Sequence, residues 1–342
     1  MKTSDFDYFL PKDLIAQTPV EPRDHSRLLL VNRESGGILD GYFYDLPDHI
    51  RKGDVLVFND SRVIPARLYG KLKDSGNVIE LLLLSRLKQG NWRALVRPGR
   101  RMRTGAKFVV GQDPQKIVLG EVLGEEKSGA RIVNLEGEEN INDVGVLPLP
   151  PYIRERVPDP ERYQTIYSKE EGSIAAPTAG LHFTGRLMKR LKEKGAEIVF
   201  VTLHVGWDSF RPLTSENPFE HQMHSEYWDL PEKSAQAINL AKREGRRVIS
   251  IGTTATRLLE NVALDQAGPP IFGGYGWADI FITPGHSFRI LDALVTNFHL
   301  PRSTLLMLTS AIAGKELLQQ AYKHAVRAKY RFYSFGDAMF IT

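Results

Sequence analysis

The sequence predicts an α/β protein in which a large mixed-sheet α/β domain is interrupted by an inserted small β-barrel. From residue 184 onward, apolar runs alternate with stretches whose apolar residues recur at helical spacing, a texture typical of α/β domains. Between residues 66 and 147, short strand-like runs follow one another with Gly or Asp/Asn turns and no helical period. The α/β domain is therefore expected over 1–65 and 148–342, and the barrel domain over 66–147.

The first sixty residues predict a hairpin and then a buried strand. Strands at 27–32 and 38–44 flank a glycine-containing turn, and an apolar run covers 55–58. In open α/β sheets, ligands gather where strands end. The polar residues directly after the apolar run are therefore candidate site residues: Asn59, Asp60 and Arg62.

The middle of the chain predicts the barrel. Strand-like runs cover 78–84, 92–96, 108–110, 116–122 and 130–135. Several short strands at such spacing are typical of a small barrel. The proline-rich segment 147–151 is interpreted as the stiff return to the larger domain.

The remaining residues supply the helices and strands of the α/β domain. Helices are expected at 184–194 and 231–244, each ended by a glycine, and from near 255, 303 and 315 onward. Strands are expected at 197–205, 248–251, 279–283, 293–296 and 331–335. The sheet is expected to be parallel or mixed.

Composition narrows the chemistry. The 342 residues include no cysteine, which excludes disulfides, thiolate catalysis, iron–sulfur clusters and cysteine-based zinc sites. The N-terminal segment mixes acids, aromatics and proline, so no export leader is expected. The longest apolar stretch, 304–314, is shorter than the roughly 18 residues that cross a bilayer. We expect a soluble cytoplasmic protein without membrane contact.

A strip of basic residues lies in the predicted barrel. Residues 86–107 contain no acidic side chain, and a strip of one charge sign fits the phosphate backbone of a nucleic acid. The alternative is a solvated outer face of the barrel. The candidate nucleic-acid contacts are Arg97, Arg100, Arg101, Arg103 and Lys107.

Two segments predict contacts with a ligand beside a helix N-terminus. Residues 173–184 combine small residues with Thr178, Gly180 and His182 just before a helix, where backbone donors favour anions. The alternative is a packed turn with a hydrogen-bonded histidine. Residues 252–257 follow a strand and open a helix, so Gly252, Thr253, Thr254 and Arg257 either hold a carboxylate or phosphate or only cap the helix.

Two further clusters carry histidine. Asn297 and His299 follow a strand and precede a helix that Ser303 can cap; they are either ligand contacts or satisfied loop groups. His221 and His224 share a helical spacing near Glu226, which raises a metal hypothesis against acid–base or structural roles. Because the spacing is not that of zincins, no metal is expected, and Glu226 is the carboxylate placed to move a proton.

Long ordered stretches of the chain resemble the S-adenosylmethionine:tRNA ribosyltransferase-isomerase family. The resemblance begins with Phe6-Asp7-Tyr8 and runs nearly end to end. Its main segments are 14–17, 26–29, 57–68, 147–153, 163–165, 175–183, 202–206, 221–226, 252–254, 296–303 and 330–337.

The resemblance implies a reaction in queuosine biosynthesis. S-adenosylmethionine would be consumed as a ribosyl donor, with no cofactor beyond it, and adenine and methionine would leave. The ribosyl group would be isomerised onto 7-aminomethyl-7-deazaguanine at the wobble position of tRNA, giving epoxyqueuosine-tRNA. The implied fold is a large α/β domain interrupted by a small β-barrel, and a monomer is expected over an oligomer.

The same resemblance assigns expected roles to the candidate residues. The acid–base groups are expected among His182, His204, Glu226 and Asp60. Gly252, Thr253, Thr254 and Arg257 are expected to hold the methionine or ribose end of the donor. The other expected substrate contacts are Asn59, Arg62, Thr178, Gly180, His221, His224, Asn297 and His299.

One turn departs from the family pattern. After Thr202–Gly206, where the family has a small residue, glycine, threonine and phenylalanine, this chain has Trp207-Asp208-Ser209-Phe210, and losing the glycine removes freedom at positive φ. A tRNA-binding protein without catalysis would tolerate this change and is the first alternative. A metal-dependent nucleic-acid hydrolase using His221, His224 and Glu226 is the second.

Overall fold

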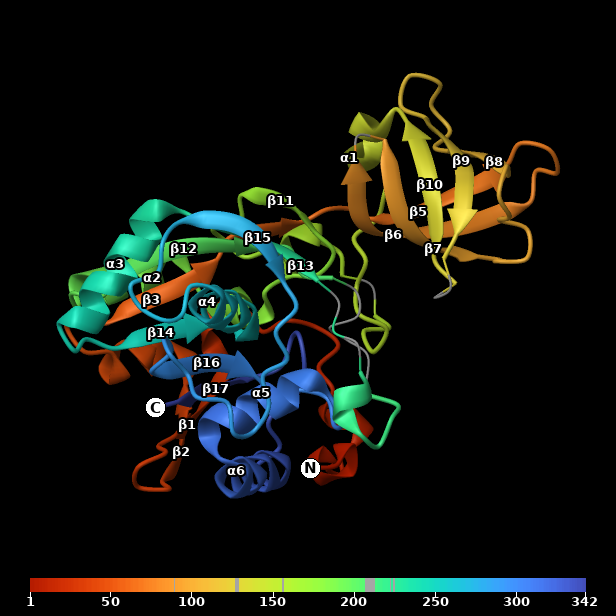
Figure 1. Cartoon of the computed structure of the whole chain (residues 1–342). Coiled ribbons are helices and arrows are strands. Elements are labelled where there is room, and N and C mark those ends of the chain that lie inside the picture. Colours follow the sequence, from red (N-terminus) through yellow and green to blue (C-terminus); the bar gives the residue numbers. More distant parts are fainter. Residues whose placement is uncertain (89, 127–128, 156, 207–212, 222, 224) are drawn as a thin grey trace. The chain divides into compact units, whose positions relative to one another are not determined.

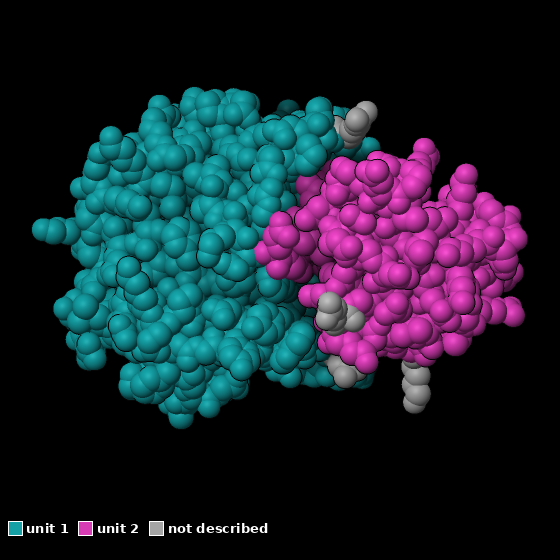
Figure 2. Space-filling view, turned by 90° about the horizontal axis from the view of Figure 1, so that it is seen from above, with its two compact units in different colours: residues 1–62, 151–170, 176–342 teal, residues 63–150, 171–175 magenta. Residues whose placement is uncertain are grey.

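The computed structural model describes residues 1–342 except 89, 127–128, 156, 207–212, 222 and 224. The chain forms two compact units, coloured separately in Figure 2: residues 1–62, 151–170 and 176–342, and residues 63–150 and 171–175. The first contains a nine-stranded mixed sheet with helices, and the second a closed six-stranded barrel. The predicted fold class is confirmed.

The large sheet has the strand order β15-β13-β12-β3-β14-β16-β17-β1-β2 (Figure 1). Four neighbouring strands in it are parallel: β12 (Glu197–Leu203), β3 (Val55–Asn59), β14 (Val248–Ile251) and β16 (Ala293–Asn297). β3, β14 and β16 are buried at every residue, as expected for strands with both faces covered. Their carboxyl ends consequently share one edge of the sheet.

The outer strands complete the sheet on both sides. On one side lie β17 (Ala338–Ile341), β1 (Arg27–Val31) and β2 (Ile38–Tyr42), and on the other β13 (Glu226–Leu230) and β15 (Gly274–Ala278). β17 pairs antiparallel with β16 and parallel with β1, which makes the sheet mixed. β13 pairs antiparallel with both β12 and β15.

Helices cover both faces of the sheet. α2 (Gly185–Glu193) is capped by Thr184 and buries Leu187 and Leu191 in one hydrophobic cluster with β3, β14 and β16. α5 (Thr304–Ala313), capped by Ser303, and α6 (Lys315–Arg327) belong to a second cluster with β1, β16 and β17. α3 (Glu232–Arg243) and α4 (Thr253–Asp265) complete the cover, and Figure 1 shows α4 lying along β14.

Short 3-10 helices connect these elements in the first unit. Each has only one or two turns, and several bury an aromatic side chain, such as Phe6, Phe43 and Tyr163. They are η1 (Thr3–Phe6), η2 (Lys12–Leu14), η3 (Arg23–His25), η4 (Phe43–His49), η6 (Pro160–Tyr163), η7 (Thr178–His182) and η9 (Pro218–Glu220).

The second unit is built around an antiparallel barrel of order β10-β7-β6-β5-β8-β9. Its tight interior is visible at Gly120, where an added Cβ would lie 2.1 Å from Phe108 Cζ. The strands are β5 (Arg67–Leu72), β6 (Val78–Lys88), β7 (Asn91–Arg97), β8 (Lys107–Val110), β9 (Val118–Glu125) and β10 (Arg131–Glu136), followed by η5 (Glu138–Asn140) and α1 (Ile141–Val144). β4 (Ser61–Val63) and β11 (Glu170–Ser173) form a separate two-stranded sheet.

Two of the predicted strands differ from the structure. The segment 279–283 is irregular because its apolar residues, among them the buried Ile282, pack against the core without joining a ladder, and β15 precedes it. The segment 331–335 is a turn region, in which Gly336 N donates to Tyr333 O, and the strand is β17 instead. The strands β4, β5, β11 and β13 lie where the sequence predicted no strand. None of the helices in the described part of the chain is long and apolar enough to span a bilayer.

Candidate active site

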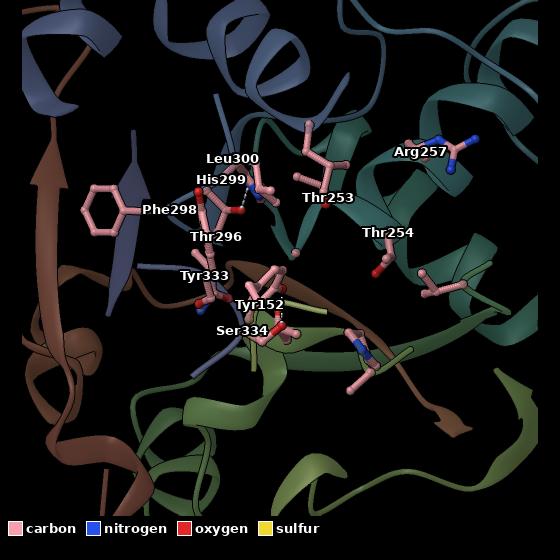
Figure 3. Close-up of a pocket in the computed structure, with 18 of the residues that line it drawn as sticks. Tyr152, Thr253, Thr254, Arg257, Thr296, Phe298, His299, Leu300, Tyr333 and Ser334 are labelled. Carbon is pink, nitrogen blue, oxygen red and sulfur yellow. Dashed lines mark hydrogen bonds between the residues drawn. The ribbon is translucent and has the colours of Figure 1, made fainter. Parts of the chain in front are cut away.

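A pocket opens where β14 and β16 end, and it encloses about 660 Å³ of empty space including its mouth. Its walls come from segments of the first unit that are far apart in sequence, among them Tyr152, residues 176–179, Glu226 of β13, the start of α4, the end of β16 with the residues after it, and residues 333–334. Figure 3 shows side chains of these segments around one space, with the Phe298 ring turned away from the others. Eight residues predicted from the sequence line this pocket: Thr178, Glu226, Gly252, Thr253, Thr254, Arg257, Asn297 and His299.

The N-terminus of α4 forms one wall. Gly252 links β14 to α4 with φ of 95°, a conformation that glycine adopts without steric cost. The first backbone N–H groups of a helix lack partners within the helix and attract anions. Thr254 Oγ1 is a buried atom beside them with no hydrogen-bond partner among the described residues. This wall therefore offers donors to an anionic group and a free hydroxyl.

A buried ion pair forms the next wall. Arg257 Nη1 contacts Glu226 Oε2, and the two side chains are 7% and 5% exposed. Glu226 Oε1 accepts a hydrogen bond of 2.8 Å from Gly206 N. Because both carboxylate oxygens have donors, the Glu226 carboxylate is held in one orientation at the pocket wall.

The side chain of Asn297, the last residue of β16, is held by Tyr333 and His182. Its Nδ2 lies 3.1 Å from Tyr333 O and 3.2 Å from His182 Nε2. His182 Nδ1 lies 2.7 Å from Ser26 Oγ, and its ring stacks on Phe43 with centroids 4.8 Å apart. Burial, with smaller contributions from Arg331 and Arg23, lowers the pKa of His182 to about 3. His182 is therefore a neutral ring.

A third wall is aromatic. The Tyr152 and Tyr333 rings lie 4.7 Å apart at 52°, and the Tyr152 hydroxyl is 2.8 Å from Ser334 Oγ. Burial raises the pKa of Tyr333 to about 12 and that of Tyr152 well above its usual value. Both phenols are thus neutral, and Figure 3 shows Tyr152 beside Ser334.

His299 contributes a second neutral imidazole. Its Nε2 lies 2.8 Å from Thr296 Oγ1, the interaction drawn dashed in Figure 3. Burial lowers the pKa of His299 to about 3. Its backbone N donates to the Tyr322 hydroxyl, at 2.9 Å. His299 is therefore fixed at the pocket in its uncharged form.

Comparison with known proteins decides the family. The family model described as queuosine biosynthesis protein matches residues 3–341. The chain belongs to the queuosine biosynthesis protein family. Two curated relatives named S-adenosylmethionine:tRNA ribosyltransferase-isomerase, from Moorella thermoacetica and Symbiobacterium thermophilum, are 52% and 51% identical, with all of this chain and all of each relative covered.

A solved structure supports the same placement. The crystal structure of an S-adenosylmethionine tRNA ribosyltransferase from Thermotoga maritima is 38% identical to the chain, with a TM-score of 0.58. The match covers 99% of this chain and all of that one. Sequence and fold therefore agree for this queuosine biosynthesis family member.

Several residues predicted for the site of this family member lie outside the pocket lining. At the end of β3, Asn59 Oδ1 accepts from Ser61 N and Leu203 N, and its Nδ2 donates to Leu203 O. The Thr202 hydroxyl donates to Asp60 Oδ1 at 2.7 Å, and burial raises the pKa of Asp60. These groups connect β3 to β12.

Three more predicted residues have surroundings of their own. Arg62 contacts Glu161 and donates to Ser168 Oγ at 3.0 Å. A Cβ on Gly180 would lie 2.0 Å from Tyr167 Oη, so close packing requires glycine there. His204 stacks on Tyr227, and burial lowers its pKa.

The histidines near Glu226 are only partly described. His221 lines a second cavity of about 490 Å³ together with Glu226 and Arg257. His224 and the turn of Trp207, Asp208 and Ser209 lie outside the described residues. Among the residues that the structure describes, no group of three His, Asp or Glu side chains could hold a metal ion.

The predicted basic strip divides into two sets. Arg86, Arg93 and Lys107 face Glu138, Glu126 and Glu121 in ion pairs. Arg97, Arg100, Arg101 and Arg103 are exposed and form no ion pair with any residue that the structure describes. Arg131 holds their loop, donating to Met102 O at 2.7 Å and to Gly99 O at 3.3 Å.

Sequence reasoning missed the aromatic wall as a ligand contact. Tyr152, Tyr333 and Ser334 lie in segments that the family resemblance included, but no spacing in the sequence brings them together. Tyr333 has a φ of 72°, which is uncommon for a bulky residue and occurs at functional sites. That strain is a property of the folded backbone.

Proposed function

We propose that this protein transfers and isomerises the ribosyl group of S-adenosylmethionine onto 7-aminomethyl-7-deazaguanine at the tRNA wobble position, giving epoxyqueuosine-tRNA and releasing adenine and methionine. The observation that carries the proposal is the identity of about half of all residues, over full length, with relatives named for this activity. A catalytic role is favoured over a binding-only role because the same chain offers a pocket with unsatisfied polar atoms.

The pocket has a suitable group for each part of the donor. The carboxylate of the methionine part fits the N-terminus of α4, with Thr253 and Thr254 beside it. The adenine ring fits the Tyr152 and Tyr333 wall, since aromatic rings stack with offset or tilted geometry. The sulfonium charge fits the Glu226 carboxylate, whose orientation Gly206 and Arg257 fix.

The chemistry needs a base for the acidified proton on the ribose carbon beside the sulfonium. Among the described residues that line the pocket, Glu226 is the one with a carboxylate. We assign Glu226 as the base that removes this proton, and Arg257 as the residue that holds the Glu226 carboxylate in place. The neutral His299 and the Tyr152 hydroxyl can exchange hydrogen bonds with the substrate while adenine leaves. The attacking tRNA amine must itself be neutral.

The decisive experiment measures turnover. Purified protein is incubated with S-adenosylmethionine and tRNA that carries the aminomethyl-deazaguanine, and adenine release is followed with the mass of the wobble nucleoside. The proposal expects adenine and a heavier base in equal amounts. Glu226→Gln should lower kcat by about 10²- to 10⁴-fold, the usual contribution of a general base. Binding of both substrates without turnover by the unmodified protein would refute the enzyme and favour a tRNA-binding protein.

The exposed arginine loop of the barrel unit is the proposed contact for the tRNA backbone. Arg97, Arg100, Arg101 and Arg103 have no carboxylate partner among the described residues, so their charge is available to phosphates. The buried Arg131 donates to backbone carbonyls of this loop, so the loop backbone that carries these four side chains is held in place. Lys107 adds a more weakly paired charge at the end of the loop, 3.9 Å from Glu121.

Salt dependence tests this contact. Replacing Arg100, Arg101 and Arg103 by alanine should weaken tRNA binding and reduce the slope of log K against log salt by roughly 2 to 3, since each phosphate contact contributes about 0.7 to 0.9. The matched control replaces Arg86 and Arg93, which are already paired with carboxylates, and should change the slope less. Equal slopes for the two variants would mean that the loop is only a solvated face.

The proposal also has the protein act as a cytoplasmic monomer without a further cofactor, with the catalytic domain over 1–65 and 148–342 and the barrel over 66–147. The absence of cysteine fits a reducing compartment. Sedimentation at micromolar concentration, with and without tRNA, measures the oligomeric state. A dimer at these concentrations would contradict this part alone.

A further inference from the structure

The side-chain amide of Asn297 has a defined orientation. Its nitrogen lies 3.1 Å from Tyr333 O, and a backbone carbonyl can only accept a hydrogen bond. Nδ2 must therefore be the atom that faces Tyr333. Its second N–H is directed at His182 Nε2, 3.2 Å away. Both donors of the amide are used inside the protein.

This orientation also fixes the tautomer of His182. Nε2 accepts from Asn297, so the ring proton is on Nδ1 and points to Ser26 Oγ at 2.7 Å. A proton on Nε2 would set two donors against each other. The ring is 5% exposed and stacked on Phe43. The pKa of about 3 agrees with a ring that stays neutral at physiological pH.

The remaining atom of the amide is unsatisfied. Asn297 Oδ1 has no hydrogen-bond partner among the described residues, the side chain is 3% exposed, and the residue lines the pocket. A buried acceptor without a donor keeps the full cost of losing its water partner, and native structures keep such groups rarely and mostly for a reason such as function. The chain of hydrogen bonds from Ser26 through His182 to Asn297 therefore ends at Asn297 Oδ1, an acceptor without a donor among the described residues.

We propose that Asn297 Oδ1 accepts a hydrogen bond from an N–H or O–H group of S-adenosylmethionine, and that His182 is the positioning residue that keeps the amide in this orientation. The inference rests on the proposed function for the identity of the ligand. It gives His182 a role behind the pocket, in place of the acid–base role expected from the sequence. No atom of His182 needs to touch the substrate.

Binding of S-adenosylmethionine, measured by calorimetry, tests the acceptor. Asn297→Leu removes it and should weaken binding roughly 10-fold, the usual effect of losing one hydrogen bond to a ligand. His182→Phe keeps a flat ring against Phe43 but removes the acceptor for Asn297, and should weaken binding about 3- to 10-fold. His182→Gln can restore an amide oxygen near Nε2, and should bind within about 3-fold of the unmodified protein.

A second measurement keeps the positioning role separate from a structural one. Nitrogen-15 NMR of His182 should show the Nδ1–H tautomer from pH 8 down to pH 5, with or without ligand. The KM for S-adenosylmethionine should rise in His182→Phe, while the Kd for tRNA stays unchanged. Thermal melting of each variant checks that it is folded.

The outcomes separate the inference from the proposed function. If Asn297→Leu and His182→Phe are folded and bind S-adenosylmethionine as tightly as the unmodified protein, or if His182 carries its proton on Nε2, the inference is wrong even when turnover is normal. If binding follows the expected order but adenine is never released, the proposed reaction is wrong and the inference stands. If the unmodified protein does not bind S-adenosylmethionine, both are wrong.

Discussion

The carboxyl end of β3 and the carboxyl ends of β14 and β16 look alike in sequence but differ in the structure. In each case a fully buried apolar strand runs into polar residues. At β3, the Asn59 amide and the Asp60 carboxylate receive partners from β12 and its neighbours. At β14 and β16, Thr254 Oγ1 and Asn297 Oδ1 have none among the described residues.

The difference separates structural polar groups from groups available to a ligand. The Asn59 and Asp60 side chains attach the end of β3 to β12, whereas Thr254 and Asn297 at the other two ends each have an oxygen without a partner in the described part of the chain and line a pocket. Substitutions at the first end should therefore change stability, and substitutions at the second should change affinity. The second and third of the predictions below test this division, and the first concerns a pocket residue whose loss should affect both properties.

The largest effect is expected at the ion pair of the pocket wall, an exception in which stability and activity fall together. Arg257→Met leaves the buried Glu226 carboxylate without the opposite charge of the Arg257 guanidinium, and should lower the free energy of unfolding by about 3–5 kcal/mol. Chemical denaturation measures it. Arg243→Met, an exposed arginine at the end of α3, is the control and should stay within about 0.5 kcal/mol. The double variant with Glu226→Leu should recover part of the loss; no recovery would contradict the pairing.

A smaller and more selective effect is expected for two threonine hydroxyls. Thr254→Val removes an unsatisfied hydroxyl and should leave stability unchanged or slightly raised, while binding of S-adenosylmethionine weakens about 3- to 10-fold. Thr202→Val removes the donor to Asp60 and should cost about 1–2 kcal/mol of stability. Chemical denaturation measures the free energy of unfolding of both variants, and calorimetry measures their affinity for S-adenosylmethionine. The reverse assignment of stability and affinity would break the comparison.

The smallest effect is a pH dependence at the β3 end. Burial raises the pKa of Asp60 in the folded protein, so its contribution to stability is fully present below the unfolded pKa near 3.8 and is lost as the pH rises through the folded pKa. Asp60→Asn mimics the protonated form and should melt at a higher temperature than the unmodified protein at pH 7. At pH 3.5 the two melting temperatures should converge; a gap that widens toward low pH would contradict the raised pKa.

The fold was largely predictable because local patterns specify it. The switch from short strands to amphipathic helices near residue 184 and the fully apolar runs of β3 and β14 each follow from neighbouring residues. The strand predicted at 331–335 was wrong because local apolar content does not show whether a partner strand is available. That partner position in the sheet is taken by β17.

The site residues were predictable only where a single segment showed both that it lies at the end of a strand and that it carries polar groups able to bind a ligand. Thr253 and Thr254 follow a strand and open a helix, so their place at the pocket could be inferred. Tyr152 and Tyr333 meet across about 180 residues of sequence, and no pattern in either segment contains the other. Whether a polar group is satisfied depends on such distant neighbours, which is why Asn59 and Asn297 were indistinguishable in sequence.

The position of β17 has a consequence for synthesis of the protein in the cell. β17 lies between β16 and β1, and it follows the β1–β2 hairpin by roughly 300 residues. Because the ribosome adds about 5–20 residues per second, β17 is synthesised on the order of 15–60 s after the β1–β2 hairpin. During that time the open edge of β1 is available to other chains, so nascent molecules are most exposed to aggregation before the last strand emerges.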